Sequence, residues 1–148
     1  AFVRDWEASR QAHERVVNAF PSSPWVDEAR YGVGFALQNQ NRFDEAVNAY
    51  TQVTTRSAAE IAAKAQLQIG LCRLEQKRFG DAATAFLVVP FTYDYPDLSA
   101  AALLEAARAL SDDRKTEQAI RILERVRRDY ADTPWAEAAL ERLKTLRK

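Results

Sequence analysis

The sequence has little that would support a fold other than a helical one. Its 148 residues include 4 glycines, 5 prolines, 1 cysteine, 1 histidine and no methionine. The low glycine and proline content excludes a collagen-like chain, a disordered tail and a turn-rich β-sandwich. One cysteine excludes an internal disulfide, and no apolar run approaches the length of about 18 residues that a membrane span needs. The lack of methionine even at position 1 suggests a processed or excised piece of a longer chain.

An excess of charge of one sign is also missing, because 21 Lys and Arg residues balance 21 Asp and Glu residues. A neutral chain is not drawn over long distances to phosphate backbones or anionic membranes. With 47% apolar residues, the chain is long enough to bury a core without a metal or a disulfide. These values indicate one soluble, compact domain.

What the sequence does contain is a repeat of 36 to 37 residues. The FDEA sequence at 43–46 recurs as FGDA at 79–82 and, more weakly, as TEQA at 116–119. The SPWVD sequence at 23–27 matches TPWAE at 133–137, which is 110 positions later. Because 110 equals 37 + 36 + 37, both markers follow one register.

Each unit has the pattern of two helices. Apolar residues recur at helical spacing in both parts of a unit, and strand alternation is not sustained anywhere. We predict helices over 3–19, 24–39, 42–55, 58–76, 78–89, 98–111, 115–129 and 134–147. We expect the β-like run at 87–91 to be a helix end that Pro90 closes.

Start signals accompany several of these helices. Ser23 and Thr133 are predicted N-caps, each followed by a proline at the first helical position. Ser57 with Glu60 three residues later predicts a capping box. Asn41 is a further expected cap, for the helix that begins near 42.

Small residues recur in the first helix of each unit, and bulky ones in the second. Gly34, Gly70 and Ala107 would let the paired helix approach closely. The bulky residues Tyr50, Phe86 and Leu123 would fill the space toward the next unit. One such hairpin cannot bury its own apolar faces, so the units must stack. The prediction is an all-α solenoid of stacked antiparallel helical hairpins, with about eight helices.

The repeated marks resemble those of tetratricopeptide-repeat proteins. That pattern has a small residue at position 8, an aromatic at 17, Ala at 20, a large residue at 24 and a small apolar residue at 27. The marks fall on Gly34, Phe43, Ala46, Tyr50 and Val53, then on Gly70, Phe79, Ala82, Phe86 and Val89, then on Ala107, Thr116, Ala119, Leu123 and Val126. Thr116 departs from the aromatic.

The resemblance implies a right-handed superhelix formed by one array over 1–148. Its parts would be a partial repeat at 1–19, repeats at 24–56, 57–93 and 97–130, and a capping or truncated helix at 133–148. The linking sequences resemble a bacterial subgroup that contains the Tol-Pal-associated periplasmic protein and the β-barrel assembly lipoprotein. This likeness implies a periplasmic or envelope location, the alternative being cytoplasmic.

In proteins of this family, certain positions of the first helices face a concave groove. Here the resemblance assigns a peptide-binding groove to Tyr31, Phe35, Gln38, Lys64, Leu67, Leu71, Leu104 and Arg108. Members with a carboxylate clamp carry Lys, Asn and Arg where this chain has Tyr31, Phe35 and Leu67, so no such clamp is expected. The apolar side chains would form a strip, unless neighbouring helices cover them.

No pattern of catalytic or metal-binding residues is present. His13 is the only histidine and lacks an accompanying motif, and Cys72 lies in an apolar helical stretch. We therefore expect no enzyme activity, no cofactor and no metal. Arg121, Arg125 and Arg128 share one helix face. They are either a patch for an acidic partner or nucleic acid, or a solvated stripe paired with Glu117 and Glu124.

Three functions stay open from the sequence. The first is a non-catalytic scaffold that binds a peptide or helix of a partner protein in the groove. The second is an architectural spacer within a longer envelope solenoid. The third, an array appended to an enzyme, has no sequence feature in its favour. No nucleic-acid partner and no insertion of this segment into a membrane are expected.

Overall fold

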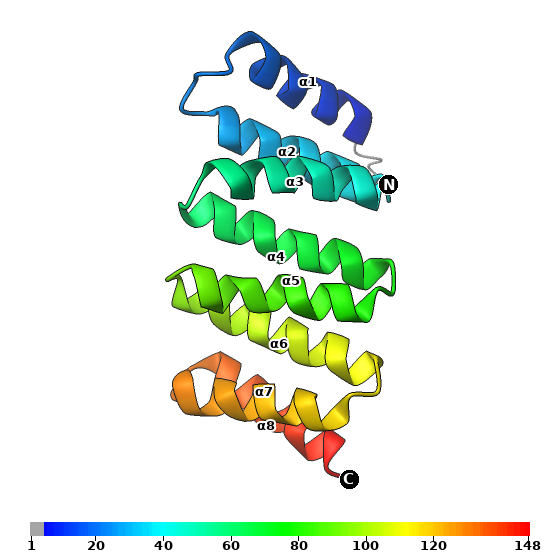
Figure 1. The fold of residues 1–148 in the computed structure, drawn as a ribbon, viewed down its shortest axis with the longest axis vertical. Helices are drawn as coiled ribbons and strands as arrows, with labels where there is room; N and C mark the ends of the chain where they lie inside the picture. The colour runs from blue at the N-terminus through cyan, green and yellow to red at the C-terminus, as the bar shows by residue number, and fades with distance from the viewer. Residues whose placement is uncertain (1–4) are drawn as a thin grey trace.

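The computed structural model describes residues 5–148, which form eight α-helices and no strand. They are α1 (Trp6–Ala19), α2 (Val26–Asn39), α3 (Phe43–Arg56), α4 (Glu60–Glu75), α5 (Phe79–Thr92), α6 (Pro96–Asp112), α7 (Thr116–Asp129) and α8 (Pro134–Leu146). Figure 1 shows them stacked in chain order along the long axis. Each helix contacts the next one, which confirms the predicted solenoid of helical hairpins. Residues 3 and 4 of the first predicted helix lie outside the described residues.

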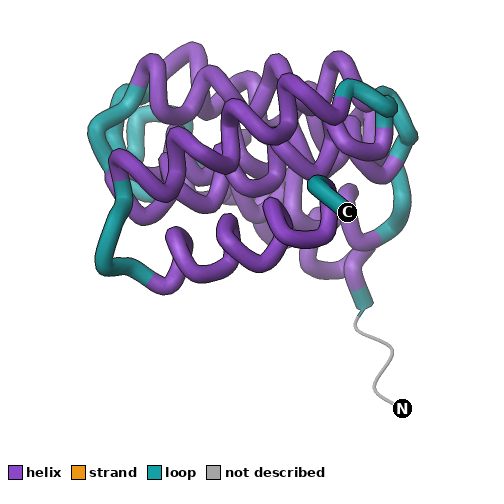
Figure 2. The backbone as a smooth tube through the Cα atoms, turned by 90° about the horizontal axis from the view of Figure 1, so that it is seen from below, coloured by secondary structure: helices purple, strands orange, loops and turns teal. Residues whose placement is uncertain are grey.

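The stack is a layered arrangement in which all helices lie across the long axis. Figure 2, turned by 90° from Figure 1, shows the helices one behind another and the connections gathered on two opposite sides. None of the helices within residues 5–148 is both long enough and apolar enough to cross a membrane.

A left-handed residue closes the first helix of each hairpin. Asn41 has φ 60°, and the N–H of Arg42 behind it donates to the carbonyl of Leu37 at 2.9 Å. Lys77 and Arg114 take the same left-handed conformation one and two repeats later. This turn satisfies carbonyls that a helix end leaves free. Asn41 therefore terminates α2, and the expectation that it caps α3 is wrong.

The two expected caps at serine and threonine behave differently. The Oγ1 of Thr133 accepts from the backbone N–H of Ala136 at 3.3 Å, so the cap of α8 is confirmed. Ser23 instead accepts from Trp25 at 3.1 Å, two residues on, and α2 begins only at Val26. The predicted Ser23 cap is wrong because its oxygen closes a local turn before the helix starts.

Two other helix boundaries also differ from the prediction. The Oγ of Ser57 accepts from Ala59 at 3.1 Å, and α4 begins at Glu60, so the predicted capping box is wrong. Pro90 does not end α5, which continues to Thr92. A proline in the last turn removes only its own N–H bond, so the helix can run two residues further.

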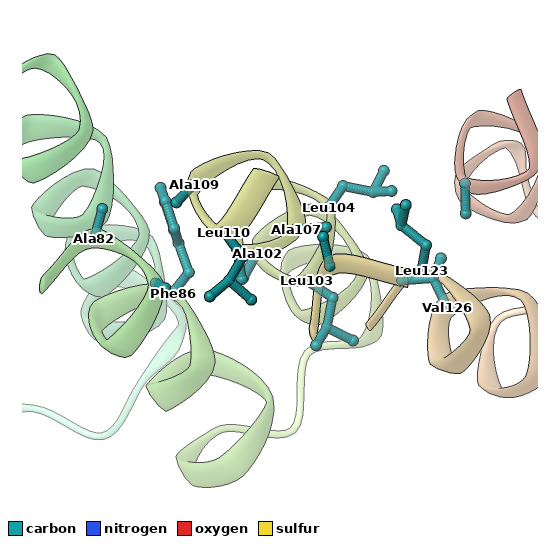
Figure 3. Close-up of a cluster of buried hydrophobic side chains, with 14 of the residues drawn as sticks. Ala82, Phe86, Ala102, Leu103, Leu104, Ala107, Ala109, Leu110, Leu123 and Val126 are labelled. Atoms are coloured by element: carbon teal, nitrogen blue, oxygen red, sulfur yellow. The ribbon is translucent and has the colours of Figure 1, made fainter. Parts of the chain in front are cut away.

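The core consists of two clusters along the stack. The N-terminal cluster contains Val33, Leu37, Ala46, Val47, Ala49, Tyr50, Val53, Ala65 and Cys72. The C-terminal cluster is larger, and its bulkiest members include Phe86, Leu103, Leu104, Leu110, Leu123 and Leu143. Figure 3 shows how side chains from successive helices meet in this second cluster. Burial both within a hairpin and between neighbouring hairpins therefore stabilises the stack.

Glycines allow the closest approaches between paired helices. A Cβ added at Gly34 would lie 2.7 Å from the ring of Tyr50, and one at Gly70 would lie 2.4 Å from the ring of Phe86. Both rings are fully buried. The predicted close approach of the paired helix is confirmed at these two small residues, because a larger residue at either glycine would push the helices apart. The rings of Tyr50 and Phe86 fill this contact within their own hairpin, in addition to facing the next unit as predicted.

Candidate functional site: the inner wall

The inner wall of the solenoid is formed by the first helices of the hairpins. Helix α2 contacts α4, α4 contacts α6, and α6 contacts α8, whereas the described second helices α1, α3, α5 and α7 do not contact one another. Helices that approach each other more closely lie on the inside of a curved stack. The first helices therefore form the concave side and the second helices the convex side.

Four of the five side chains predicted to form an apolar strip keep exposed surface, and they lie on two adjacent first helices, α2 and α4. Phe35 on α2 is 39% exposed, and its ring meets that of Trp6 edge to face at a centroid distance of 5.5 Å. Tyr31 is half-buried, with its ring 5.3 Å from that of Tyr50. Burial raises the pKa of the Tyr31 hydroxyl, and a hydrogen bond with Gln68 of α4 opposes this shift. Tyr31 thus joins α2 to α4 as well as exposing part of its ring.

Leu67 and Leu71 on α4 are both half-buried and pack with one side against the C-terminal cluster. Spaced four residues apart, they lie on one face of the helix. Together with Tyr31 and Phe35 they are apolar side chains that keep part of their surface open. We call these four residues the apolar strip.

The other four predicted groove residues have different environments. Gln38 is half-buried and accepts the hydroxyl of Tyr50 at 2.6 Å, so one of its polar groups is already engaged. Lys64 is exposed and pairs with Glu60 at 3.6 Å. Leu104 is 8% exposed and lies in the C-terminal cluster, as Figure 3 shows, so it offers almost no surface to a ligand.

Arg108, the last of the predicted residues, borders a hollow of about 400 Å³ between α6 and α8. Ala107, Leu123 and Leu146 supply apolar lining, and Ser111, Asp112, Glu141, Arg142 and Thr145 supply polar groups. The guanidinium of Arg142 donates to the carbonyl of Leu104 at 3.1 Å, which ties α8 to α6. The inner wall therefore carries an apolar strip on α2 and α4 and a mixed hollow on α6 and α8.

Sequence analysis missed the contribution of α8 to this wall. Glu141 and Thr145 stand 37 positions after Leu104 and Arg108, so the same repeat register would have found them. Arg142 and Leu146 follow directly after these two positions, and only the packing of α8 against α6 shows that they reach the hollow.

The described residues do not bring together a reactive constellation. Cys72 is fully buried, and burial raises the pKa of its thiol to about 12, so the thiol stays protonated and inert at neutral pH. The ring of His13 packs against Gly32 on α2, as expected for a packing residue. Within residues 5–148, no group of His, Cys, Asp and Glu side chains is arranged to hold a metal ion.

The arginines of α7 are not paired as the sequence suggested. Arg125 and Arg128 both pair with Asp129, at 3.5 and 3.0 Å, and not with Glu117 or Glu124. These arginines hold the pKa of Asp129 below its usual range. Glu124 pairs instead with Arg147, which directly follows α8. Arg125 and Arg128 are therefore paired within their own helix, but with Asp129 in place of Glu117 and Glu124.

The family model of the tetratricopeptide repeat matches two segments of the chain, residues 28–57 and 101–133. These segments overlap the predicted units at 24–56 and 97–130. No curated protein matches the chain.

Solved structures with the same architecture come from Podosopora anserina. One is a putative kinesin light chain with nearly identical TPR-like repeats, at 18% identity and a TM-score of 0.73, covering 95% of this chain and 75% of that one. A single-substitution form of the same protein gives 19% identity and a TM-score of 0.74, covering 95% and 74%. Similarity at this level of identity establishes the shared fold, a solenoid of tetratricopeptide type.

Proposed function

We propose that this chain is a non-catalytic scaffold that binds a peptide or helical segment of a partner protein on its inner wall. Tetratricopeptide repeats generally mediate protein–protein interaction, and a solenoid offers an extended concave surface for it. Because the linking sequences resemble those of bacterial envelope proteins, we also propose a periplasmic or envelope location.

The apolar strip is the observation that carries this proposal. Tyr31, Phe35, Leu67 and Leu71 keep part of their apolar surface exposed on adjacent helices, although each could have been a polar residue. Contiguous exposed apolar surface on a soluble protein often marks a binding site. A few such anchors can supply most of the binding energy, while the polar groups of the mixed hollow between α6 and α8 contribute specificity.

The test uses a phage-displayed peptide library selected on the purified chain. We expect enriched peptides with apolar anchor residues, whose affinity falls roughly 10-fold in Phe35→Ala and in Leu71→Ala, since a binding anchor is worth more than about 1 kcal/mol. Phe20→Ala is the matched control, because Phe20 is 64% exposed in the connection between α1 and α2, outside the apolar strip. Circular dichroism melting would verify that each variant folds.

Two outcomes would contradict the proposal. Enriched peptides that bind Phe35→Ala as tightly as the unaltered chain would place the site elsewhere. A clear loss of thermal stability in both variants would show that these side chains serve the core. If the library yields no binder at all, the alternative is favoured, which is a spacer within a longer solenoid without a ligand of its own.

A further inference from the structure

A second candidate surface lies on the convex side, between α5 and α7. These helices run in the same direction on either side of α6 (Figure 1). A hollow of about 600 Å³ separates them. Its lining comes from the first half of each helix and from the end of α6, and consists of Gly80, Asp81, Ala83, Thr84, Leu87, Leu110, Lys115, Gln118, Arg121 and Ile122.

The α5 side of this surface is apolar. Thr84, Leu87 and Phe91 follow one another at spacings of three and four residues, so they lie on one face of the helix. Phe91 is 92% exposed, more than any other large apolar side chain of the described residues. The face is also open at Gly80, where an added Cβ would meet nothing within 4 Å. Core packing therefore does not explain why a phenylalanine stands at position 91.

The α7 side of this surface carries uncompensated positive charge. Arg121 is exposed, forms no ion pair in the described part of the chain, and lines the hollow. One turn further, Arg125 shares Asp129 with Arg128, which leaves two guanidinium groups for one carboxylate. These arginines continue along α7 on the same side as Arg121.

The remaining charges of the hollow are balanced by local partners. Lys115 pairs with Asp113 at 3.2 Å, and Asp81 pairs with Arg78 at 2.7 Å. The net charge that faces a ligand therefore comes from the arginines of α7. An apolar face on one helix and a positive edge on the next are complementary to a segment with apolar and acidic faces.

We propose that the surface between α5 and α7 docks an amphipathic, acidic segment of a partner protein. Its apolar side chains would lie on Leu87, Phe91 and Ile122, and its carboxylates would pair with Arg121 and Arg125. Leu87, Ile122 and Arg121 line the hollow itself, and Phe91 lies one turn beyond Leu87 on the same face of α5. This site is separate from the inner wall and would allow the scaffold to hold two partners at once.

The experiment measures the binding of three fluorescein-labelled probes by anisotropy. The first is a synthetic helical peptide in which pairs of Glu alternate with pairs of Leu, the second has Lys in place of Glu, and the third is an oligothymidylate. We expect the Glu peptide to bind most tightly and to weaken as salt is raised. We expect a loss of about 5-fold or more in Phe91→Ala and about 10-fold or more in Arg121→Glu. Both altered residues are exposed, so the variants should keep the fold.

Phe20→Ala is the control for this site, because Phe20 is 64% exposed in the connection between α1 and α2, and its affinity for the Glu peptide should stay unchanged. The proposal is overturned if the Lys peptide or the oligothymidylate binds as tightly as the Glu peptide, if the Glu peptide does not bind, or if Phe91→Ala binds it normally. A failure here leaves the phage-display result at Phe35 untouched, because the two tests use residues on opposite sides of the solenoid.

Discussion

The connections before α2 and before α8 carry nearly the same sequence and have different structures. In residues 130–135, Thr133 caps α8, which begins at Pro134, and Trp135 packs against the C-terminal cluster. In residues 20–25, Ser23 forms only a local turn, α2 begins at Val26, and Trp25 is 68% exposed. Equal sequence markers therefore do not guarantee an equal helix start.

A single backbone position accounts for much of this difference. Asp132 adopts a left-handed conformation with φ 64°, whereas its counterpart Ser22 is not among the described residues with positive φ. Asp takes up this conformation more readily than most residues, and it turns the chain so that Thr133 faces the free N–H groups of α8. Pro21, which replaces Ala131, further restricts the chain before α2.

The two ends also differ in how they bury their helices. Helix α8 buries Ala139 and Leu143, while α1 has no buried residue. At equivalent positions of the repeat, Leu103 is fully buried and Arg30 is 6% exposed, with Nε and Nη1 lacking a hydrogen-bond partner. The comparison indicates that α1 and α2 are held in the stack more weakly than the C-terminal helices, because polar contacts replace apolar burial there.

The largest effect is expected from changing these two equivalent positions. Leu103→Ala should lower the free energy of unfolding by about 2–5 kcal/mol, because it leaves a cavity in the C-terminal cluster. Replacing the ion pair as a whole, in Arg30→Leu combined with Asp27→Ala, should be neutral or raise it by about 1 kcal/mol, since the pair at 3.6 Å lacks good hydrogen bonds. Arg30→Leu alone should lower it, because the buried Oδ1 of Asp27 then has no cation beside it. Urea unfolding followed by circular dichroism would measure these variants, with Arg30→Lys as the charge-retaining control. A loss above about 1 kcal/mol in the double variant would show that this ion pair holds the hairpin together.

A smaller difference in stability loss is expected between substitutions at Thr133 and at its counterpart Ser23. Thr133→Ala removes the acceptor for the N–H of Ala136 and should cost about 1 kcal/mol. Ser23→Ala removes only the turn bond to Trp25 and should cost no more than about 0.5 kcal/mol. Matched thermal melts of the two variants would test this. Equal losses would mean that Ser23 caps α2 in solution after all.

The smallest expected effect is the pH dependence of the contact that holds α1 against the end of α2. Hydrogen bonds from Arg10 and Gln40 lower the pKa of Glu7 from 4.5 to about 2, and Gln40 belongs to the end of α2. A carboxylate with a depressed pKa stabilises the folded state above pH 4.5, and this stabilisation is lost as the pH falls toward 2.

The stability difference between the unaltered chain and Glu7→Gln should therefore be present at pH 6 and shrink to nothing near pH 2. Melting curves at a series of pH values would measure this difference. Glu7 is exposed to solvent, so the difference should be small even at pH 6. A difference that does not depend on pH would rule out a contribution from the Glu7 charge.

Local patterns predicted most of the fold. All eight helices lie where the apolar spacing indicated, and the close approach of the paired helix at Gly34 and Gly70 followed from the small residues that recur in the repeat. These features depend on residues a few positions apart or on one repeated contact. The helix starts at Ser23 and Ser57 were wrong because a cap depends on backbone angles that side-chain type does not specify.

The sequence predicted the exposure of the candidate site's residues less well than it predicted the helices. The register placed Leu104 and Arg108 in one group of groove residues, yet Leu104 is buried and Arg108 is exposed. Whether a side chain at such a position reaches solvent depends on how closely the next hairpin packs over it. The hollow between α6 and α8 likewise exists only because α8 docks on α6.

The sequence by itself determined that this chain forms helices, where they lie and that they repeat. The reason is that the helical spacing of apolar residues and the recurring small and bulky residues are present within each unit. The tertiary structure alone decided which apolar residues stay exposed, on the apolar strip and at Phe91. It also decided that Nε and Nη1 of Arg30 lack a hydrogen-bond partner and that Arg121 forms no ion pair in the described part of the chain. Exposure and charge pairing arise between units that are distant in sequence, so they depend on the geometry of stacking and not on any local pattern.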